Sequence, residues 1–378
     1  MQSEPKSAYI HIPFCTHKCS FCDFAAFAGL EAREDDYVQA LTNEMKVRLA
    51  NRARPTLDTL FYGGGTPGLL EIRKLSVIQE ALLSLCNLSK NAEVSLETTP
   101  HAITAQKARA WSELGINRLS IGIESLSDYE LKEMGRDHSR AEALAGLEVA
   151  ANVIDNLSID FMYGLPGQTL ESFAQTLQEA LDLARRLPIT HISAYGLEIA
   201  INSPLLVKHP RESSSYPSEE ETVKMYDLLI DSLAEEGFAQ YEVSNFAKPG
   251  FESRHNLTYW KNEPYFAFGV GAHRYVDGVR SGNSKSFNKY VRDFSEGEVL
   301  ETIDEQGRIQ EGIMLGLRLT EGIDLVDFEK RYGVNLRNTL AGEIDFLQKE
   351  GFLAIESGRL KITRKGMPLS NSILARLI

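Results

Sequence analysis

The sequence is poor in cysteine, in long apolar runs and in net positive charge. It has four cysteines in 378 residues and a formal charge of −13 at pH 7. Four cysteines are too few for the disulfide framework of a secreted protein, and no apolar leader follows Met1, so we do not expect a secreted, disulfide-stabilised protein. No apolar run reaches the length of a membrane span. An acidic chain binds nucleic acid or an anionic membrane poorly, and we expect neither as a partner.

Length and composition predict a chain with one large domain and a smaller one. The 378 residues, 43% of them hydrophobic, are enough to bury a large core. Free thiols and the lack of an export signal predict a reducing compartment, the cytoplasm. We expect an iron-sulfur cluster to survive there.

Three of the four cysteines lie within eight residues. Cys15, Cys19 and Cys22 have the spacing C-x3-C-x2-C. A structural zinc site normally has four Cys or His ligands and is closed. A [4Fe-4S] cluster held by three cysteines leaves one iron without a protein ligand, and that iron is open to chemistry.

Zinc is the main alternative for this motif. His11 or His17 could supply a fourth ligand, which would make the motif a zinc site in an interaction protein. Cys86 lies in an apolar helical run and is interpreted as a small core residue.

Six β-rich runs alternate with amphipathic helical patterns between about residues 7 and 246. The expected strands are Ala8–Ile12, Thr56–Tyr62, Ala92–Glu97, Arg118–Glu124, Leu157–Tyr163 and His191–Glu198. The expected helices are Asp36–Ala50, Ile72–Leu85, Ala105–Leu114, Ala141–Val153, Leu170–Leu187 and Glu219–Glu236. This order predicts right-handed βαβ units and a parallel sheet. Six units are too few for a full (β/α)8 barrel, so we predict an α/β fold with a partial (β/α)6 barrel; a doubly wound open sheet has the same local signature.

Polar and glycine-rich clusters follow all six expected strands. In parallel α/β folds the carboxyl ends of the strands share one rim, where ligands bind. The clusters are the cysteine loop, Gly63–Pro67, Glu97–Pro100, Gly122–Glu124, Asp160–Pro166 and Tyr195–Glu198. We therefore expect them to form one site.

The three glycines Gly63, Gly64 and Gly65 expose backbone groups to a ligand after the second strand. No Gly-Lys-Ser/Thr follows them, and they do not form a Gly-x-Gly-x-x-Gly fingerprint. A tight turn is the alternative interpretation.

The pattern changes after about residue 246. Stretches 246–260 and 265–275 have no clear period and are expected to be extended segments or loops packed on the barrel. Helical patterns at Gly307–Arg318, Leu325–Tyr332 and Leu336–Lys349 precede short strands near 353–355 and 360–362, a winged-helix-like arrangement. We divide the chain into a barrel (1–246), a connecting segment (247–303) and a mainly helical C-terminal domain (304–378).

Motifs spread over nearly the whole chain resemble a known group of proteins. The cysteine spacing resembles the radical S-adenosylmethionine (SAM) motif, in which SAM chelates the open iron. Ala8–Cys15, Tyr62–Pro67, Asn117–Ser125 and Asp160–Gln168 resemble signatures of the HemN/HemW group, which includes the oxygen-independent coproporphyrinogen III oxidases. His255-Asn-Leu-Thr-Tyr-Trp260 resembles the His-Asn-x-x-Tyr-Trp motif of the HemW branch.

The resemblance implies a set of site residues. Cys15, Cys19 and Cys22 would hold a [4Fe-4S] cluster. The implied SAM contacts are Tyr9, Phe21, Gly64, Gly65, Thr66, Glu97, Glu124, Arg136 and Asp160. Carboxylates can accept hydrogen bonds from SAM's ammonium or ribose groups, and Arg136 can pair with its carboxylate. Arg136 has the weakest positional support, because it lies on a loop after the fourth strand.

The resemblance also implies a function with two alternatives. HemW-like proteins are regarded as haem chaperones, which predicts haem as ligand, an acceptor protein that could be a membrane protein, and an electron donor. His255 is the first candidate for the haem ligand and His273 the second; a hydrogen-bonded structural histidine is the alternative for each. The other function is a radical oxidase acting on a porphyrinogen. Phe24 stands where the oxidases have a further cysteine, and the stretch before Cys15 is shorter than theirs, so we favour the chaperone.

Overall fold

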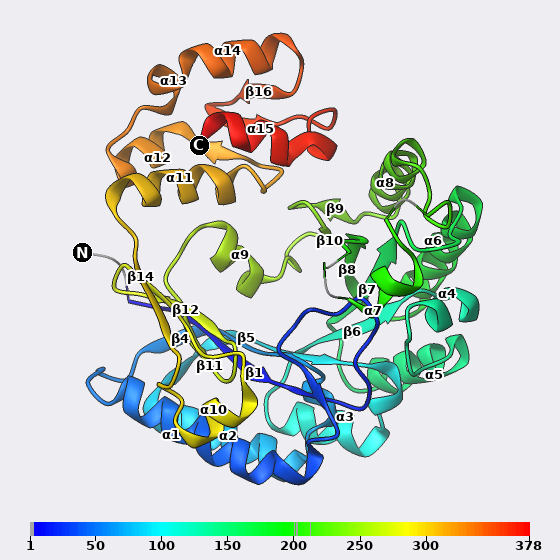
Figure 1. The fold of residues 1–378 in the computed structure, drawn as a ribbon, viewed down its shortest axis with the longest axis vertical. Coiled ribbons are helices and arrows are strands. Elements are labelled where there is room, and N and C mark those ends of the chain that lie inside the picture. Colours follow the sequence, from blue (N-terminus) through cyan, green and yellow to red (C-terminus); the bar gives the residue numbers. More distant parts are fainter. Residues whose placement is uncertain (1–3, 200, 202, 212) are drawn as a thin grey trace.

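The computed structural model describes residues 4–199, 201, 203–211 and 213–378, and its centre is a nine-stranded sheet with the order β11-β1-β4-β5-β6-β7-β8-β10-β9 (Figure 1). Six strands run parallel in sequence order. They are β1 (Ser7–Ile12), β4 (Thr56–Gly64), β5 (Asn87–Thr98), β6 (Arg118–Glu124), β7 (Leu157–Tyr163) and β8 (Ile189–Gly196). The six expected strands are confirmed, except that β8 begins earlier and ends before Glu198.

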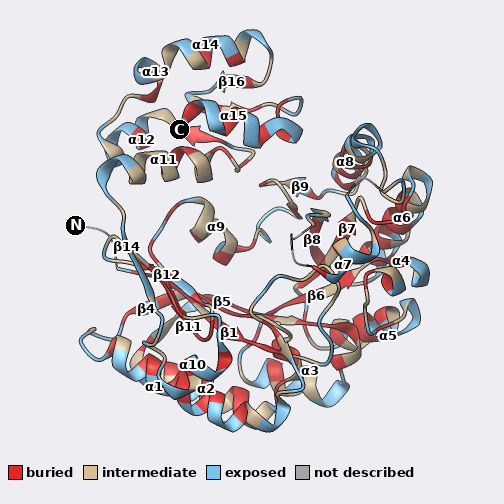
Figure 2. Ribbon diagram, viewed as in Figure 1, coloured by how far each residue is buried: buried red, intermediate tan, exposed pale blue. Residues whose placement is uncertain are grey.

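One long helix precedes each return to the sheet. These helices are α1 (Glu34–Leu49), α2 (Ile72–Leu85), α3 (Ala105–Glu113), α5 (Arg140–Ala151), α6 (Leu170–Arg186) and α8 (Glu219–Glu235). Neighbours in this series pack on one another around the outside of the sheet, so the fold is a partial (β/α)6 barrel and not a doubly wound sheet. The strands are mostly buried (Figure 2), as expected for a parallel sheet covered by helices.

Sequence signals explain where several helices begin. Ser139, Thr169 and Ser218 each accept a backbone N–H from the first turn of α5, α6 and α8 in a capping box. Short elements complete the barrel half: β2 (Phe14–Cys15), β3 (Phe27–Ala28), α4 (Asp128–Glu133), α7 (Pro204–Lys208), β9 (Ala239–Gln240) and the 3-10 turns Glu31–Arg33, Pro67–Leu69 and Pro100–Ala102.

The segment after residue 246 differs from the expectation of extended segments and loops. Its His-Asn-Leu-Thr-Tyr-Trp stretch forms the helix α9 (Arg254–Trp260), capped by the Ser253 side chain. β10 (Asn245–Ala247) pairs with β8, and β11 (Phe266–Phe268) returns to pair in parallel with β1. The segment therefore contributes strands to the barrel sheet. The three-part division of the chain stays a prediction, and β10 crosses its first boundary.

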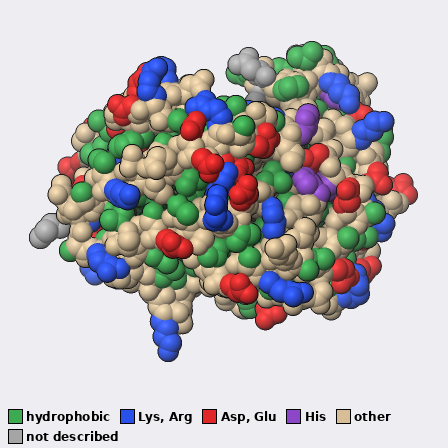
Figure 3. Space-filling model, turned by 90° about the horizontal axis from the view of Figure 1, so that it is seen from below, with side chains coloured by type: hydrophobic (Ala, Val, Ile, Leu, Met, Phe, Trp, Pro, Cys, Tyr) green, Lys and Arg blue, Asp and Glu red, His purple; other side chains and the backbone are tan. Residues whose placement is uncertain are grey.

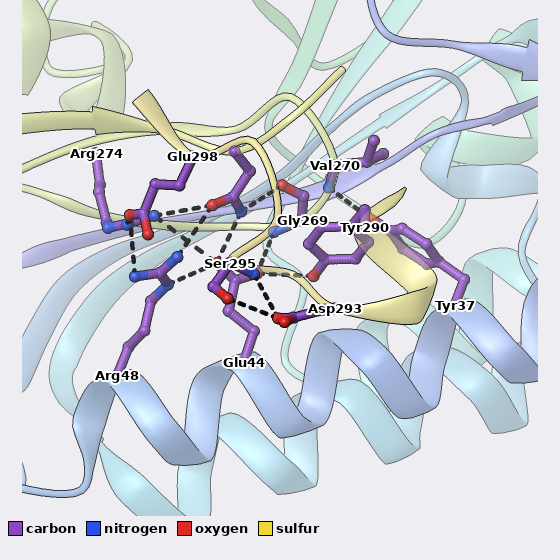
Figure 4. A network of polar contacts seen from close by, with 11 residues as sticks. Tyr37, Glu44, Arg48, Gly269, Val270, Arg274, Tyr290, Asp293, Ser295 and Glu298 are labelled. Atoms are coloured by element: carbon purple, nitrogen blue, oxygen red, sulfur yellow. Dashed lines mark hydrogen bonds and ion pairs between the residues drawn. The ribbon is translucent and has the colours of Figure 1, made fainter. Parts of the chain in front are cut away.

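A small antiparallel sheet and one helix follow β11. They are β12 (His273–Val276), β13 (Val279–Gly282), α10 (Phe287–Arg292) and β14 (Val299–Thr302). A buried polar network joins this region to α1 (Figure 4). Glu44 is fully buried and accepts hydrogen bonds from Gly269 N at 2.9 Å, Tyr290 Oη at 2.7 Å, Asn283 Nδ2 at 2.7 Å and Arg48 Nε at 2.7 Å. A buried carboxylate is stable only with such partners, so Glu44 fixes the segment on the barrel.

The C-terminal part is mainly helical, as expected. It contains α11 (Glu305–Gly316), α12 (Leu325–Tyr332), α13 (Leu336–Thr339), α14 (Ala341–Lys349), the 3-10 turn Met367–Leu369 and α15 (Ser370–Leu377), with an antiparallel sheet of β15 (Ile323–Asp324), β17 (Arg359–Ile362) and β16 (Leu353–Glu356). The single helix expected over 336–349 is wrong, because the helical conformation is interrupted at Leu340. The helix α15 was not predicted from the sequence.

The C-terminal part lies over one end of the barrel (Figure 1). α9 touches both β4 and α11, and Arg364 pairs with Asp227 of α8 at 3.0 Å. On the face in Figure 3, acidic and basic side chains are interspersed, so that face has no extended basic patch. Within the described ranges, none of the helices combines the length and the apolar character that crossing a bilayer requires.

Candidate functional site

The carboxyl ends of the barrel strands surround a cavity of about 1100 Å³. Cys15, Cys19 and Cys22 are free, half-buried and line it together. The cavity is also lined by Phe21, Phe24, Gly64, Gly65, Thr66, Glu97, Gly122, Glu124, Arg136 and Asp160. The expectation that the rim clusters converge on one site is confirmed by this lining.

Two polar side chains contact the thiols. Arg136 Nη1 donates to Cys19 Sγ at 3.2 Å, and Thr66 Oγ1 lies 3.8 Å from Cys15 Sγ. Burial raises the pKa of the Cys15 thiol to about 11 and also raises the pKa of Cys19 and Cys22, while Arg136 acts in the opposite direction on Cys19. A metal must displace the thiol protons to bind here, which is the usual coupling between metal binding and deprotonation.

The three glycines lie at the end of β4, beside β1 and the backbone that leads into the cysteine loop. Gly64 has φ +118°, and a Cβ there would lie 2.5 Å from the His11 ring. A Cβ on Gly65 would lie 2.7 Å from the carbonyl oxygen of Phe14, in the backbone that leads into Cys15. Gly65 N also donates to Ile12 O at 2.8 Å. Gly63 and Gly64 end β4 and Gly65 follows it, and Gly64 and Gly65 line the cavity. Their lack of a side chain permits the close approach of β1 and of the backbone before Cys15.

Two half-buried carboxylates lie behind the glycines. Glu97 accepts Gly64 N–H at 2.9 Å, and burial raises the pKa of Glu97 to about 7. Asp160 accepts Ser120 Oγ at 3.2 Å, and burial raises its pKa as well. Both carboxylates line the cavity, so they can receive hydrogen bonds from a bound ammonium or hydroxyl group.

Arg136 and Glu124 form a buried pair across the cavity. Their side chains are 12% and 14% exposed and 3.7 Å apart. Glu124 has φ +66° at a register shift between β6 and β7, and this irregularity turns its carboxylate toward Arg136. Burial raises the pKa of Glu124 to about 7 against the effect of Arg136. Arg136, the weakest candidate from position in the sequence, thus contacts both a thiol and a carboxylate.

Tyr9 and His255 line a second cavity of about 170 Å³, which adjoins the first. Glu97, Ser120, Asp160 and Tyr195 line both cavities. Tyr9 is therefore separated from the cysteines by the carboxylates, although it was expected in the same contact set.

Hydrogen bonds within the protein engage both ring nitrogens of His255. It is 1% exposed, and its ring nitrogens are both hydrogen-bonded, Nδ1 to Thr59 Oγ1 at 2.7 Å and Nε2 to Tyr259 Oη at 2.8 Å. Burial lowers the pKa of His255 to about 3, so it is neutral. Because both ring nitrogens are engaged within the protein, the geometry favours the structural alternative, and haem ligation by His255 stays a prediction. His273 is exposed on β12.

Some lining residues had no contact assigned to them from the sequence, although Tyr195 was expected on the rim as part of the sixth cluster. Tyr195 is 42% exposed although protein surrounds it, because its ring faces the two cavities. Its position at the end of β8 was a usable signal. Arg318, Met367, Leu369 and Asn371 close the large cavity from the C-terminal part, and no local pattern marks them.

Comparisons with known proteins agree with this geometry. The Radical SAM superfamily profile matches residues 9–180, and the HemN C-terminal domain profile matches residues 303–369. The solved structure of the E. coli coproporphyrinogen III oxidase HemN, described as a radical SAM enzyme, has a TM-score of 0.86 at 22% identity over 99% of this chain and 90% of that one. The chain is thus a radical SAM protein by fold.

Sequence relatives define the family more closely. The Bacillus subtilis "Heme chaperone HemW" is 34% identical, with 99% of each chain covered, and the E. coli protein of the same name is 32% identical over 98% of this chain and 97% of its own. This chain belongs to the HemW family.

Proposed function

We propose that this protein binds haem and delivers it to an acceptor protein. The HemW relatives are named heme chaperones, and the observation that carries the proposal is the cavity of about 1100 Å³ between the cysteine loop and the C-terminal part. Its wall combines apolar side chains with a few charged groups, as small-molecule sites usually do. The protein itself would work in the reducing cytoplasm, with an electron donor and an acceptor that could be a membrane protein.

Cys15, Cys19 and Cys22 are the proposed ligands of a [4Fe-4S] cluster. The donor set fits, because three thiols face one cavity and leave the fourth iron for SAM. A reduced cluster of this class supplies one electron to the sulfonium of SAM. Zinc is the alternative ligand of these thiols, and a count of iron and sulfide in the protein would distinguish the two.

The proposed SAM contacts follow from the polar groups around the thiols. Arg136 is suited to hold the carboxylate of SAM, because its guanidinium faces the cavity next to Cys19 and its buried Nε has no partner among the described residues. Glu97 and Asp160 are suited to the ammonium and ribose groups, with Gly64, Gly65, Thr66, Glu124 and Phe21 around them. Tyr9 would act through Glu97.

The large cavity is the proposed haem site. His17, Met162, Tyr195 and Met367 line it and are side chains of types that can ligate haem iron. His255 is not among them. Phe24, 64% exposed, lies at the edge of the same cavity.

Haem titration of an anaerobic, cluster-replete preparation tests the proposal. We expect about one haem per chain. Leu369→Trp should lower the haem affinity at least tenfold, because the larger side chain takes up space in the cavity. Leu300→Trp is the matched control, since Leu300 is 68% exposed on β14 and away from the cavity lining. We expect no oxidation of coproporphyrinogen III by the same preparation with SAM and a reductant. Robust decarboxylation would overturn the chaperone assignment.

A further inference from the structure

Three possible metal ligands meet beside the cysteine loop, outside the set proposed for the cluster. They are His101, in the turn after β5, and Asp137 and His138, in the loop after α4. One ligand atom from each lies within 4.8 Å of the other two. Acidic and histidine side chains often gather without binding a metal, so the state of each nitrogen and oxygen decides the case.

His138 has a buried nitrogen lone pair without a partner. The residue is 5% exposed, and its Nε2 is 3.2 Å from the carbonyl oxygen of Ile123, to which only an N–H can donate. Nδ1 is then the unprotonated nitrogen, and among the described residues it has no hydrogen-bond partner. Metal-binding histidines commonly donate their second nitrogen to a backbone carbonyl in this way. Burial, and then Arg136, lower the pKa of His138 to about 4, which keeps it neutral.

His101 and Asp137 complete the trio from the more exposed side. His101 Nδ1 is 3.4 Å from Asp137 Oδ1, and the side chains are 21% and 29% exposed. The other carboxylate oxygen of Asp137 accepts the hydroxyl of Thr16 in the cysteine loop.

Charge at this place is mixed. The guanidinium of Arg136 precedes Asp137 and opposes a cation, but it is engaged with Gly122 O at 2.6 Å and with Cys19 and Glu124. The carboxylate of Asp137 and, at longer range, that of Glu142 offset it.

We propose that His101, Asp137 and His138 bind a divalent transition-metal ion, such as Fe²⁺ or Zn²⁺. Two imidazole nitrogens and one carboxylate oxygen suit these borderline ions and leave coordination positions for water on the exposed side. Such an ion would hold the loop of Arg136 against Thr16, and so restrain the cysteine loop from outside the cluster. It would add one metal ion per chain to the iron of the cluster in a reconstituted preparation.

Cobalt titration tests this site without depending on the cluster. The Cys15→Ser, Cys19→Ser, Cys22→Ser chain removes the competing thiolates, and Co²⁺ reports nitrogen and oxygen ligands by its visible d–d bands. We expect one Co²⁺ per chain, no thiolate charge-transfer band, and affinity at least tenfold lower in His101→Asn and His138→Gln. His209→Asn is the control, because His209 lies outside both the trio and the cavity lining, and it should bind Co²⁺ as the parent does.

The same titration is repeated on cluster-replete wild type. Because the cluster occupies the three cysteines there, loss of the cluster can be distinguished from loss of the second site. His101→Asn changes a partly exposed side chain, and near-UV circular dichroism checks the fold of His138→Gln. Equal Co²⁺ affinity in the parent, His101→Asn and His138→Gln would overturn the site, whether or not the cluster and haem assays succeed.

Discussion

Replacing His255 by alanine should lower stability and leave haem binding unchanged. The change leaves the hydroxyls of Thr59 and Tyr259 without their buried partner. It also removes a ring stacked on Phe61 with a centroid distance of 5.0 Å. An orphaned buried polar group costs roughly 1–3 kcal/mol and an aromatic contact about 1 kcal/mol, so we expect the free energy of unfolding to fall by about 4 kcal/mol at pH 7.5.

The cost of His255→Ala should shrink in acid. The native pKa of His255 is about 3, whereas an unfolded histidine titrates near 6.5. Below about pH 6.5 the unfolded wild type binds a proton at His255, whereas the native state does not. The free energy of unfolding of the wild type therefore falls by about 1.4 kcal/mol per pH unit below that pH, and the variant does not have this loss. At pH 5.5 we therefore expect the variant to cost about 3 kcal/mol.

Urea denaturation at pH 7.5 and 5.5 measures both values, and haem titration of the folded variant measures binding. His273→Ala is the matched control and should change stability by less than about 0.5 kcal/mol, because His273 is exposed. A His255→Ala protein of wild-type stability that loses haem would refute the structural role and restore His255 as a ligand.

Three further variants test the site and its support. Gly65→Val should lose the iron-sulfur cluster together with SAM binding, because its side chain meets the backbone before Cys15; retention of iron and sulfide with only SAM binding lost would contradict this. Arg136→Met should keep the cluster but lower the affinity for SAM at least tenfold, as followed by the SAM-induced change of the cluster's EPR spectrum, and Arg136→Lys should be intermediate. A SAM response of Arg136→Met equal to that of the wild type would refute the contact. Glu44→Gln should lower the free energy of unfolding in urea by about 3 kcal/mol, since buried donors lose their anion; a loss below about 1 kcal/mol would show that Glu44 is dispensable.

The sequence predicted the barrel and its rim because both depend on local periodicity. Alternating strands and helices impose a parallel order, and that order places residues as distant as Cys15 and Asp160 on one cavity wall. The helix α9 escaped detection, since seven residues rich in aromatic groups show no clear period. The break at Leu340 was missed for the opposite reason, because the apolar pattern continues through it.

Partners of buried side chains could not be predicted in the same way. The resemblance drew attention to His255, but Thr59 lies 196 positions away in the sequence and Tyr259 meets His255 only because the segment is helical. Whether a histidine can ligate iron depends on which of its nitrogens is free, and that is a property of the packed structure. By that criterion His138, which no motif marked, has a buried nitrogen without a hydrogen-bond partner among the described residues, whereas both nitrogens of His255 are engaged.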